Sequence, residues 1–173
     1  MEKRPSDFMF RLMALEFKIR DFFKSRKVIV QEIGIKPGFA VLDFGCGPGG
    51  YIPPVAQLAG KKGMVYALDA HPLAIKMVDS VVSKKHLTNV KTILSDAGTG
   101  LPDKSVDVVL LFDILHDLKA PNIVLSEIRR VLKPGAALSV TDHHLDEPDI
   151  TSRVTKSGLF RVSSKGLHAH SFK

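Results

Sequence analysis

The stretch from Val41 to Gly50 constrains the fold more than any other part of the chain. An apolar segment that contains Asp43 leads directly into the run Gly45-Cys46-Gly47-Pro48-Gly49-Gly50. Glycine permits left-handed backbone angles and the close approach of a ligand, because it has no Cβ atom. A helix is expected to begin just after this run, and its N-terminal amides and dipole can receive a polar group. The stretch therefore predicts a strand, a tight loop and a helix that together form a nucleotide-type pocket.

The glycine run by itself leaves the ligand open. It satisfies the pattern G-x-G-x-x-G, and Asp69 lies 19 residues beyond Gly50, where an acidic residue would bind a ribose. A dinucleotide site of a nicotinamide-dependent oxidoreductase is one interpretation, and a turn without a ligand is another. Asp43 favours a different ligand, because a carboxylate would repel a pyrophosphate. It suits a ligand with an ammonium group and a sulfonium centre, and S-adenosylmethionine carries both.

Strand-like and helical segments alternate along the chain. Apolar runs predict strands at 39–44, 64–69, 90–94, 106–112 and 136–142, and helices are predicted at 52–59, 72–86 and 120–132. This alternation predicts right-handed βαβ units and a parallel sheet covered on both faces. Prolines 53, 54, 72 and 121 fall in first helical turns, and Pro134-Gly135 closes the helix that ends at Leu132. Near the C-terminus, 149–157 predicts a short helix, and 160–164 with 167–172 predicts a hairpin around a Lys165-Gly166 turn.

The segment Asp43-Phe44-Gly45-Cys46-Gly47-Pro48-Gly49 resembles motif I of the class I S-adenosylmethionine-dependent methyltransferases. Later segments resemble further motifs in family order: Ala67-Leu68-Asp69, Ser95-Asp96-Ala97, 101–109 and 127–135. The resemblance covers roughly residues 28–172. It implies a doubly wound, Rossmann-like α/β fold with a seven-stranded, mostly parallel sheet in the order 3-2-1-4-5-7-6, the last strand antiparallel. It also implies S-adenosylmethionine as cofactor and S-adenosylhomocysteine as product.

The glycine loop takes specific roles from this resemblance. The backbone of Gly45, Gly47 and Gly49 would approach the methionine part and the ribose of the cofactor. Asp43 would hold the ammonium end, directly or through water. We interpret Cys46 as the small side chain that the loop requires, not as a nucleophile.

The remaining expected cofactor contacts follow the second, third and fourth strands: Asp69, Ala70, His71, Asp96, Ala97 and Phe112. Asp69 would accept both ribose hydroxyls, and a helix cap ahead of Pro72 is the alternative for this residue. Ala70 or His71 would flank the adenine. Asp96 would receive its exocyclic amine, and Ala97 would donate a backbone amide.

A catalytic base is needed only where the acceptor must lose a proton. Methyl transfer is an in-line displacement on an activated cation, so positioning and desolvation dominate. His116 follows the fourth strand and is the best-placed base, ahead of His143 and His144, and a packed or surface histidine is the alternative for each. No metal is expected, because a pair formed by His168 and His170 has no third ligand nearby in sequence.

Residues 6–26 predict a separate helix. Phe8, Leu12, Leu15, Ile19 and Phe22 recur at helical spacing, and this stripe is expected to pack on the core. We interpret the whole chain, 1–173, as a single methyltransferase domain. Its residues 1–26 are an N-terminal extension and a candidate lid over the acceptor, and 27–173 are the cofactor-binding core. The lid hypothesis reflects the family's frequent N-terminal helices and the short connection over 142–160.

Composition limits the binding partners and the cellular location that we expect for the protein. The formal net charge of +7 suits nucleic acid, but the basic residues crowd the first 27 positions and no RNA-binding signature accompanies them. A solvated basic helix face is the simpler interpretation, and peripheral membrane contact through this helix is a further hypothesis. One cysteine excludes an intramolecular disulfide, and neither a membrane-spanning run nor a secretory signal is evident. We therefore expect a cytoplasmic protein.

The expected function is methyl transfer from S-adenosylmethionine to a small or hydrophobic acceptor. Leu101-Pro102 and 130–135 resemble the broad group that contains quinone-ring and small-molecule methyltransferases, although Ala136 stands where that group usually has a second glycine. Two alternatives stay open. One is a methyltransferase-like module that binds the cofactor and assists a partner, and the other is the nicotinamide-dependent oxidoreductase.

Overall fold

The computed structural model describes residues 6–23, 26–166 and 169–173. Within these residues seven strands form one sheet in the order β3-β2-β1-β4-β5-β7-β6. The strands are β1 (Ala40–Phe44), β2 (Met64–Asp69), β3 (Val90–Leu94), β4 (Val106–Phe112), β5 (Leu132–Thr141), β6 (Val162–Lys165) and β7 (His170–Phe172). β7 runs antiparallel to both β5 and β6, whereas the pairs from β3 to β5 are parallel. The predicted fold class, strand order and antiparallel last strand are confirmed.

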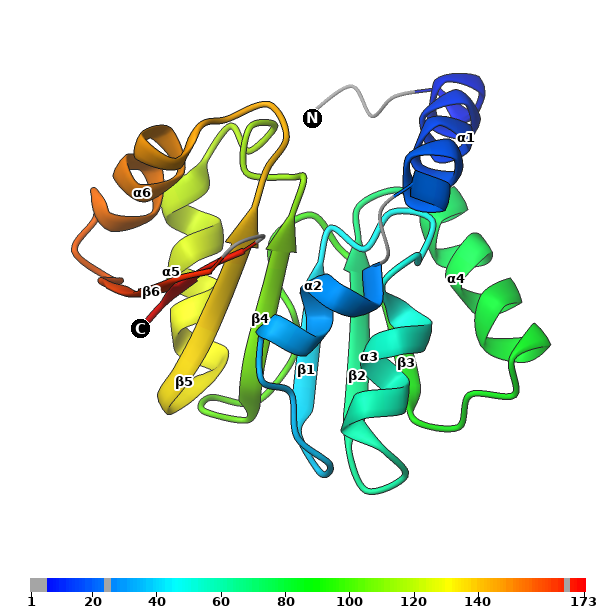
Figure 1. Cartoon of the computed structure of the whole chain (residues 1–173), viewed down its shortest axis with the longest axis horizontal. Coiled ribbons are helices and arrows are strands. Elements are labelled where there is room, and N and C mark those ends of the chain that lie inside the picture. The colour runs from blue at the N-terminus through cyan, green and yellow to red at the C-terminus, as the bar shows by residue number, and fades with distance from the viewer. Residues whose placement is uncertain (1–5, 24–25, 167–168) are drawn as a thin grey trace.

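Helices cover both faces of the sheet (Figure 1). One face carries α2 (Arg26–Glu32), α3 (Ile52–Ala59) and α4 (Pro72–Lys84), and the other carries α5 (Pro121–Val131) and α6 (Glu147–Thr155). The helix α1 (Asp7–Phe23) lies beyond the end of the sheet toward which the parallel strands point. This end of the sheet is where ligands bind in doubly wound folds.

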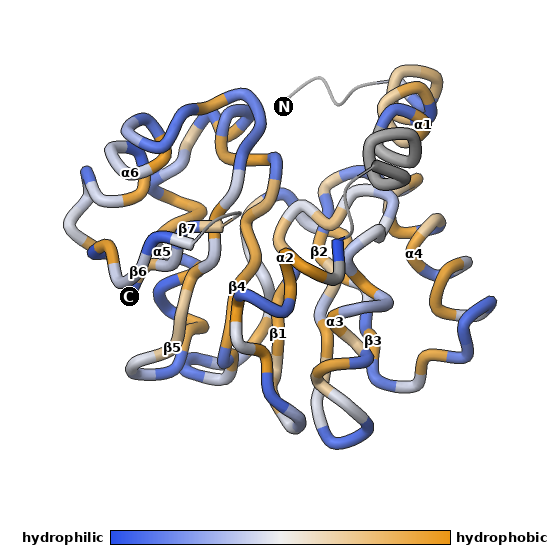
Figure 2. The backbone as a smooth tube through the Cα atoms, viewed as in Figure 1, coloured by the Kyte–Doolittle hydropathy of each residue, from blue (hydrophilic) through white to orange (hydrophobic). Residues whose placement is uncertain are grey.

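Successive residues of the central strands pack into two separate cores. In β4, Val108 and Leu110 join the core under α2 and α3, whereas Val109 and Leu111 join the core under α5 and α6. Side chains alternate between the faces of a strand, so a strand covered on both faces must be apolar throughout. Figure 2 shows this concentration of apolar residues along the strands. Asp43 is the exception in β1, where it lies between Ala67 of β2 and Leu110 of β4.

The boundary between α5 and β5 differs from the prediction. The helix ends at Val131 and the strand begins at once with Leu132, which pairs with Val106 of β4. The register then shifts, and Pro134 and Gly135 lie inside β5 instead of closing a helix. Gly135 has φ +77°, a backbone angle that accommodates this irregularity without strain.

The helix predicted over 6–26 is confirmed as α1, which ends at Phe23, three residues before the predicted end. A second helix, α2, begins at Arg26 and packs Val30 against the core under α3. The prediction that the apolar stripe of this first helix packs on the core is wrong. Phe8, Leu12 and Leu15 are exposed, whereas Phe10 and Ala14 are buried. The side chains of Ile19 and Phe22 lie outside the described part of the structure.

The closing hairpin also differs in detail. Lys165 is the last residue of β6 and pairs with His170 of β7, so the predicted Lys165-Gly166 turn is wrong. The connection instead runs from Gly166, whose amide donates to the carbonyl of Ala169, to Ala169 itself. Among the described residues, no helix combines the length and the apolar character needed to cross a bilayer.

Candidate functional site

A cavity of about 870 Å³ opens where the carboxyl ends of β1, β2 and β4 meet. β1 lies between β2 and β4, so the strand order reverses here, and doubly wound folds bind ligands at such a point. The walls come from α1, the start of α2, the loops after β1 to β4 and the start of α5. The volume lies near the upper end of the range of about 300–1,000 Å³ for small-molecule sites.

Most residues of the expected cofactor site line this cavity. They are Asp43, Gly45, Cys46, Gly47, Asp69, Ala70, His71, Asp96, Ala97 and Phe112. Gly49 lies outside the lining. It has φ +80°, and a Cβ atom there would lie 2.8 Å from Cγ2 of Val78, so this glycine allows α4 to pack closely against the loop.

The amides of the glycine loop bond within the protein. Those of Gly45 and Cys46 donate to the carbonyl of Leu68 at 2.8 and 2.9 Å. That of Gly47 donates to Oδ2 of Asp69 at 2.8 Å. The following helix begins with Pro53 and Pro54 in its first turn, and proline has no N–H group. These three amides and the two prolines therefore offer no donor to a pyrophosphate, and the polar-group site expected at the helix start stays a prediction.

Asp43 is a buried carboxylate with an orphaned oxygen. The residue is 2% exposed, and its Oδ2 has no hydrogen-bond partner among the described residues. Burial raises the pKa of Asp43 to about 7; the charge of Asp69 adds to this rise, and that of Arg26 opposes it. A buried acceptor without a donor is costly. Because Asp43 lines the cavity, a cationic donor on a ligand would remove this cost.

Asp69 joins the glycine loop to the end of β2. Its Oδ2 accepts the amide of Gly47 and its Oδ1 accepts the amide of His71, both at 2.8 Å. Burial raises the pKa of Asp69, and these two hydrogen bonds work against that rise. The alternative role as cap of α4 is wrong, because Nδ1 of His71 accepts the amide of Leu73 and caps that helix. Each carboxylate oxygen keeps a second lone pair, so Asp69 can still accept ligand hydroxyls.

His71 anchors α1 to the cavity wall. The rings of Phe10 and His71 stack with centroids 4.4 Å apart. Because Nδ1 of His71 accepts a backbone amide, the ring proton resides on Nε2, which lies 3.8 Å from the carboxylate of Asp7. Met9, Phe10 and Met13 of α1 therefore form part of the cavity lining.

Arg26 is a cavity residue that the sequence analysis missed. Its guanidinium lies over the ring of Tyr51, 4.7 Å from the ring centroid. It fills the space that a Cβ atom of Gly50 would occupy, so only glycine at position 50 admits it there. The signal in the sequence is Gly50, which lies just beyond the segment from Asp43 to Gly49 that resembles motif I.

The loop beyond β3 is held in place by Glu127 of α5. Oε1 of Glu127 accepts the amide and the hydroxyl of Thr99 at 2.8 and 2.6 Å. Arg130 donates to Glu127 and to the carbonyl of Leu101, and its hydrogen bond lowers the pKa of Glu127 to about 2. This network fixes the segment that carries Asp96 and Ala97. The sequence marked 127–135 as a motif, but its link to this loop could not be inferred from it.

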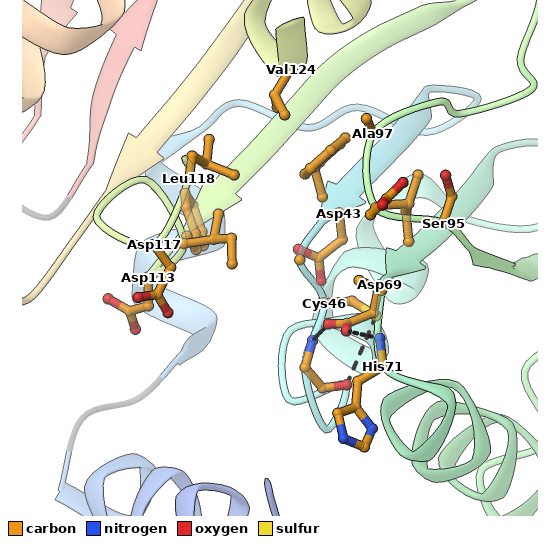
Figure 3. A pocket seen from close by; sticks show the side chains of 18 of the residues that line it. Asp43, Cys46, Asp69, His71, Ser95, Ala97, Asp113, Asp117, Leu118 and Val124 are labelled. Carbon is orange, nitrogen blue, oxygen red and sulfur yellow. Dashed lines mark hydrogen bonds between the residues drawn. The ribbon is translucent and has the colours of Figure 1, made fainter. Parts of the chain in front are cut away.

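The wall opposite the glycine loop follows β4. Figure 3 shows Asp113, Asp117 and Leu118 across the cavity from Asp69 and His71. Asp113 has φ +54°, an uncommon angle for a residue other than glycine. Its carboxylate accepts the amide of His143 and pairs with the imidazole of the same residue. These bonds turn the chain away from β4 and place the following loop beside the cavity.

The structure does not bring His116 into the cavity lining. Its Nδ1 lies 2.9 Å from both carboxylate oxygens of buried Asp142, and its ring lies 4.2 Å from that of His144. Its Nε2 lies 3.5 Å from the carboxylate of Asp117, which does line the cavity. His143 and His144 also lie outside the lining. His116 is therefore adjacent to the cavity through Asp117.

The expectation that His168 and His170 form no metal site falls partly outside the described residues, because His168 is not among them. In the part of the chain that the structure describes, no three His, Cys, Asp or Glu side chains are grouped to hold a metal ion.

Comparison with known proteins decides the family. Residues 35–164 match the model of a methyltransferase domain family. The chain belongs to this family. This methyltransferase domain is 32% identical over 117 residues to a demethylmenaquinone methyltransferase of Geobacillus stearothermophilus. The aligned residues cover 67% of the chain and 50% of that relative. It is 33% identical over 111 residues to ribosomal RNA large subunit methyltransferase E of Methanocaldococcus jannaschii, covering 62% of the chain and 45% of that relative.

A solved structure supports the same assignment. A SAM-dependent methyltransferase from Aquifex aeolicus has a TM-score of 0.76 and 27% identity, covering 86% of this chain and 87% of that one. The methyltransferase domain spans about half the length of the two curated relatives above. The class I family implies S-adenosylmethionine as its cofactor. The orphaned Asp43 oxygen fits the ammonium group of that cofactor.

Binding of S-adenosylhomocysteine is expected to release a proton from Asp43. The ammonium group favours the carboxylate form, but Asp43 is half protonated near pH 7. Affinity should therefore fall as the pH drops below 7, by up to about tenfold per pH unit. Isothermal titration calorimetry in buffers of different ionisation enthalpy measures both the affinity and the released proton.

The matched control for this titration is Asp43→Asn, which should bind weakly at every pH and release no proton at this site. Affinity that is constant from about pH 6 to pH 8, with heats that do not depend on the buffer, would contradict the assignment of Asp43.

Proposed function

We propose that the protein transfers the methyl group of S-adenosylmethionine to a small, hydrophobic acceptor. The observation that carries this proposal is one cavity with two different walls. The wall made by β1, β2 and the glycine loop is rich in carboxylates. The facing surface carries Asp113 and Asp117 as well, but it adds the apolar side chains of Met9, Met13, Ile114, Leu118, Ile123 and Val124. A cofactor and an acceptor can therefore meet in a single enclosure.

The charges of the first wall match the ends of the cofactor. Asp43 would pair with its ammonium group, and Arg26 on the same wall would pair with its carboxylate, since the amino-acid part is zwitterionic. Asp69 would accept the ribose hydroxyls. Asp96 and Ala97 would bind the edge of the adenine.

The protein's contribution to the reaction would be placement and exclusion of water. The bond from sulfur to the methyl carbon breaks as the bond from the acceptor atom to that carbon forms, and S-adenosylhomocysteine leaves. The sulfonium is already activated, so this chain has to align the two reactants within the apolar enclosure. The stack of Phe10 on His71 would hold α1 over the acceptor as a lid.

The charge of the cavity favours a small acceptor over a nucleic acid. Asp43, Asp69, Asp96, Asp113 and Asp117 line it, against two cationic residues, Arg26 and Lys119. These carboxylates would repel a phosphodiester backbone. The names of the two relatives point to different acceptors, a demethylmenaquinone and a ribosomal RNA, so the family alone does not choose. Peripheral membrane contact through α1 is part of this proposal, because it would give access to an apolar acceptor.

The glycine loop and the family match bear differently on the two alternative functions. The internally bonded amides of the glycine loop and the family match speak against a nicotinamide-dependent oxidoreductase. A module that binds the cofactor and assists a partner would have the same cofactor wall, and only turnover distinguishes it from an enzyme.

We expect transfer of labelled methyl groups from S-adenosylmethionine to at least one member of a panel of hydroquinones, catechols and phenols. Scintillation counting of the extracted acceptor measures this transfer. A truncation that lacks residues 1–23 and keeps Arg26 should lose most of the turnover but bind S-adenosylhomocysteine nearly as well. If the intact protein binds S-adenosylhomocysteine and methylates no acceptor in the panel, the module is the better account.

His116 is proposed as the base for an acceptor that must lose a proton. Asp142 engages Nδ1, which leaves Nε2 beside Asp117 to take that proton. His116→Ala should lower kcat by about 10²–10⁴-fold and flatten its pH dependence. His144→Ala is the matched control, because this neighbouring ring makes no such pair with Asp142. Retention of most of the rate by His116→Ala across the pH range would remove the assignment.

A further inference from the structure

The helix α1 has apolar side chains on two opposite faces. Its inner face packs Phe10 and Ala14 into the protein. Its outer face consists of Phe8, Leu12 and Leu15, which are 73%, 53% and 55% exposed. Their spacing of four and three residues places these three side chains in one stripe along the helix.

The outer face is not explained by packing within the described chain. Large apolar side chains that gather in a stripe on a surface mark an interaction site more often than scattered ones do. In Figure 1 α1 stands clear of the sheet, beyond the ends of the parallel strands. Figure 2 shows apolar residues along the described part of this helix.

Charge identifies the partner. Residues 1–27 contain eight Lys or Arg and four Asp or Glu. Around the helix, exposed Arg11 borders the stripe beside Leu15, and exposed Glu16 borders it beside Leu12. An apolar stripe in a segment of net positive charge is typical of a helix that lies in the interface of an anionic bilayer. Two copies of this chain joined through the same face would bring their basic segments together, and like charges repel.

The position of α1 links this face to the cavity. Met9 and Ile123 both line the cavity and are 54% and 62% exposed, so they lie on its open side. Met9 follows Phe8 directly in α1. A surface that contacts the outer face of α1 would therefore lie beside the opening.

We propose that the outer face of α1 docks onto an anionic lipid bilayer and brings the cavity opening to an apolar acceptor dissolved in it. The docking is argued from the exposed apolar face of α1 and from the net positive charge of residues 1–27. The delivery of an acceptor rests on the proposed function.

Cosedimentation with vesicles of phosphatidylglycerol and phosphatidylcholine tests the docking with the full chain. We expect binding to these vesicles, little binding to vesicles of phosphatidylcholine alone, and a loss of binding when salt is raised to about 1 M, where the Debye length is about 3 Å. Leu12→Ser should weaken the partition coefficient roughly tenfold, because one buried leucine is removed from the contact.

Leu94→Ser is the matched control, since Leu94 is 54% exposed on the edge strand β3 and is not part of α1. It should bind vesicles like the unaltered protein, and circular dichroism should show that both variants are folded. Equal binding by Leu12→Ser and Leu94→Ser, or no sedimentation at all, would overturn the proposal. A concentration-dependent dimer in analytical ultracentrifugation that Leu12→Ser abolishes would overturn it in favour of self-association.

Calorimetry with S-adenosylhomocysteine in the absence of vesicles separates this proposal from the proposed function. Leu12→Ser should bind S-adenosylhomocysteine as the unaltered protein does. A loss of vesicle binding alone would then count against the docking. A loss of S-adenosylhomocysteine binding alone would count against the proposed function.

Discussion

The buried carboxylate of Asp43 is the interaction on which the candidate site depends. A strand covered on both faces must be apolar, and β1 nevertheless carries an acidic residue between Ala67 and Leu110. One of its oxygens has no partner among the described residues, and its pKa is raised to about 7. The fold therefore retains an unfavourable feature where the cavity begins. A cationic ligand would turn this local cost into binding free energy.

The rest of the cavity is arranged around that charge. Gly50 leaves the space through which Arg26 reaches the cavity. Asp69 accepts the amide of Gly47 and the carbonyl of Leu68 accepts those of Gly45 and Cys46, so these three amides are not available to a phosphate. Glu127 and Arg130 belong to α5, on the face of the sheet opposite α2, α3 and α4, and their hydrogen bonds fix the loop beyond β3. α1 contributes apolar side chains to the cavity lining from beyond the ends of the strands. Together these contacts suit a compact, zwitterionic cofactor in contact with an apolar acceptor.

The sequence predicts the framework well because the signals for it are local. The bounds of β2, β3, β4 and α3 agree with the predicted ranges, since apolar runs and first-turn prolines mark them directly. Arg26 could not be found this way, because its position depends on α2 and on Gly50 at once. Periodicity revealed an apolar stripe in α1 but not which of its two apolar faces packs inward. The left-handed angle at Asp113 and the contact of His116 with Asp142 lie in the segments that follow β4 and β5, and no local pattern contains this contact.

Thermal unfolding at about pH 8, with and without S-adenosylhomocysteine, tests the central role of Asp43 most directly. The raised pKa means that the ionised group destabilises the unliganded fold above pH 7, so Asp43→Asn should unfold at a higher temperature than the unaltered protein. For a chain of this size each kcal/mol shifts the midpoint by about 2–4 °C. S-adenosylhomocysteine should raise the midpoint of the unaltered protein and leave that of the variant nearly unchanged. A less stable variant, or equal stabilisation of both proteins by the ligand, would contradict the account.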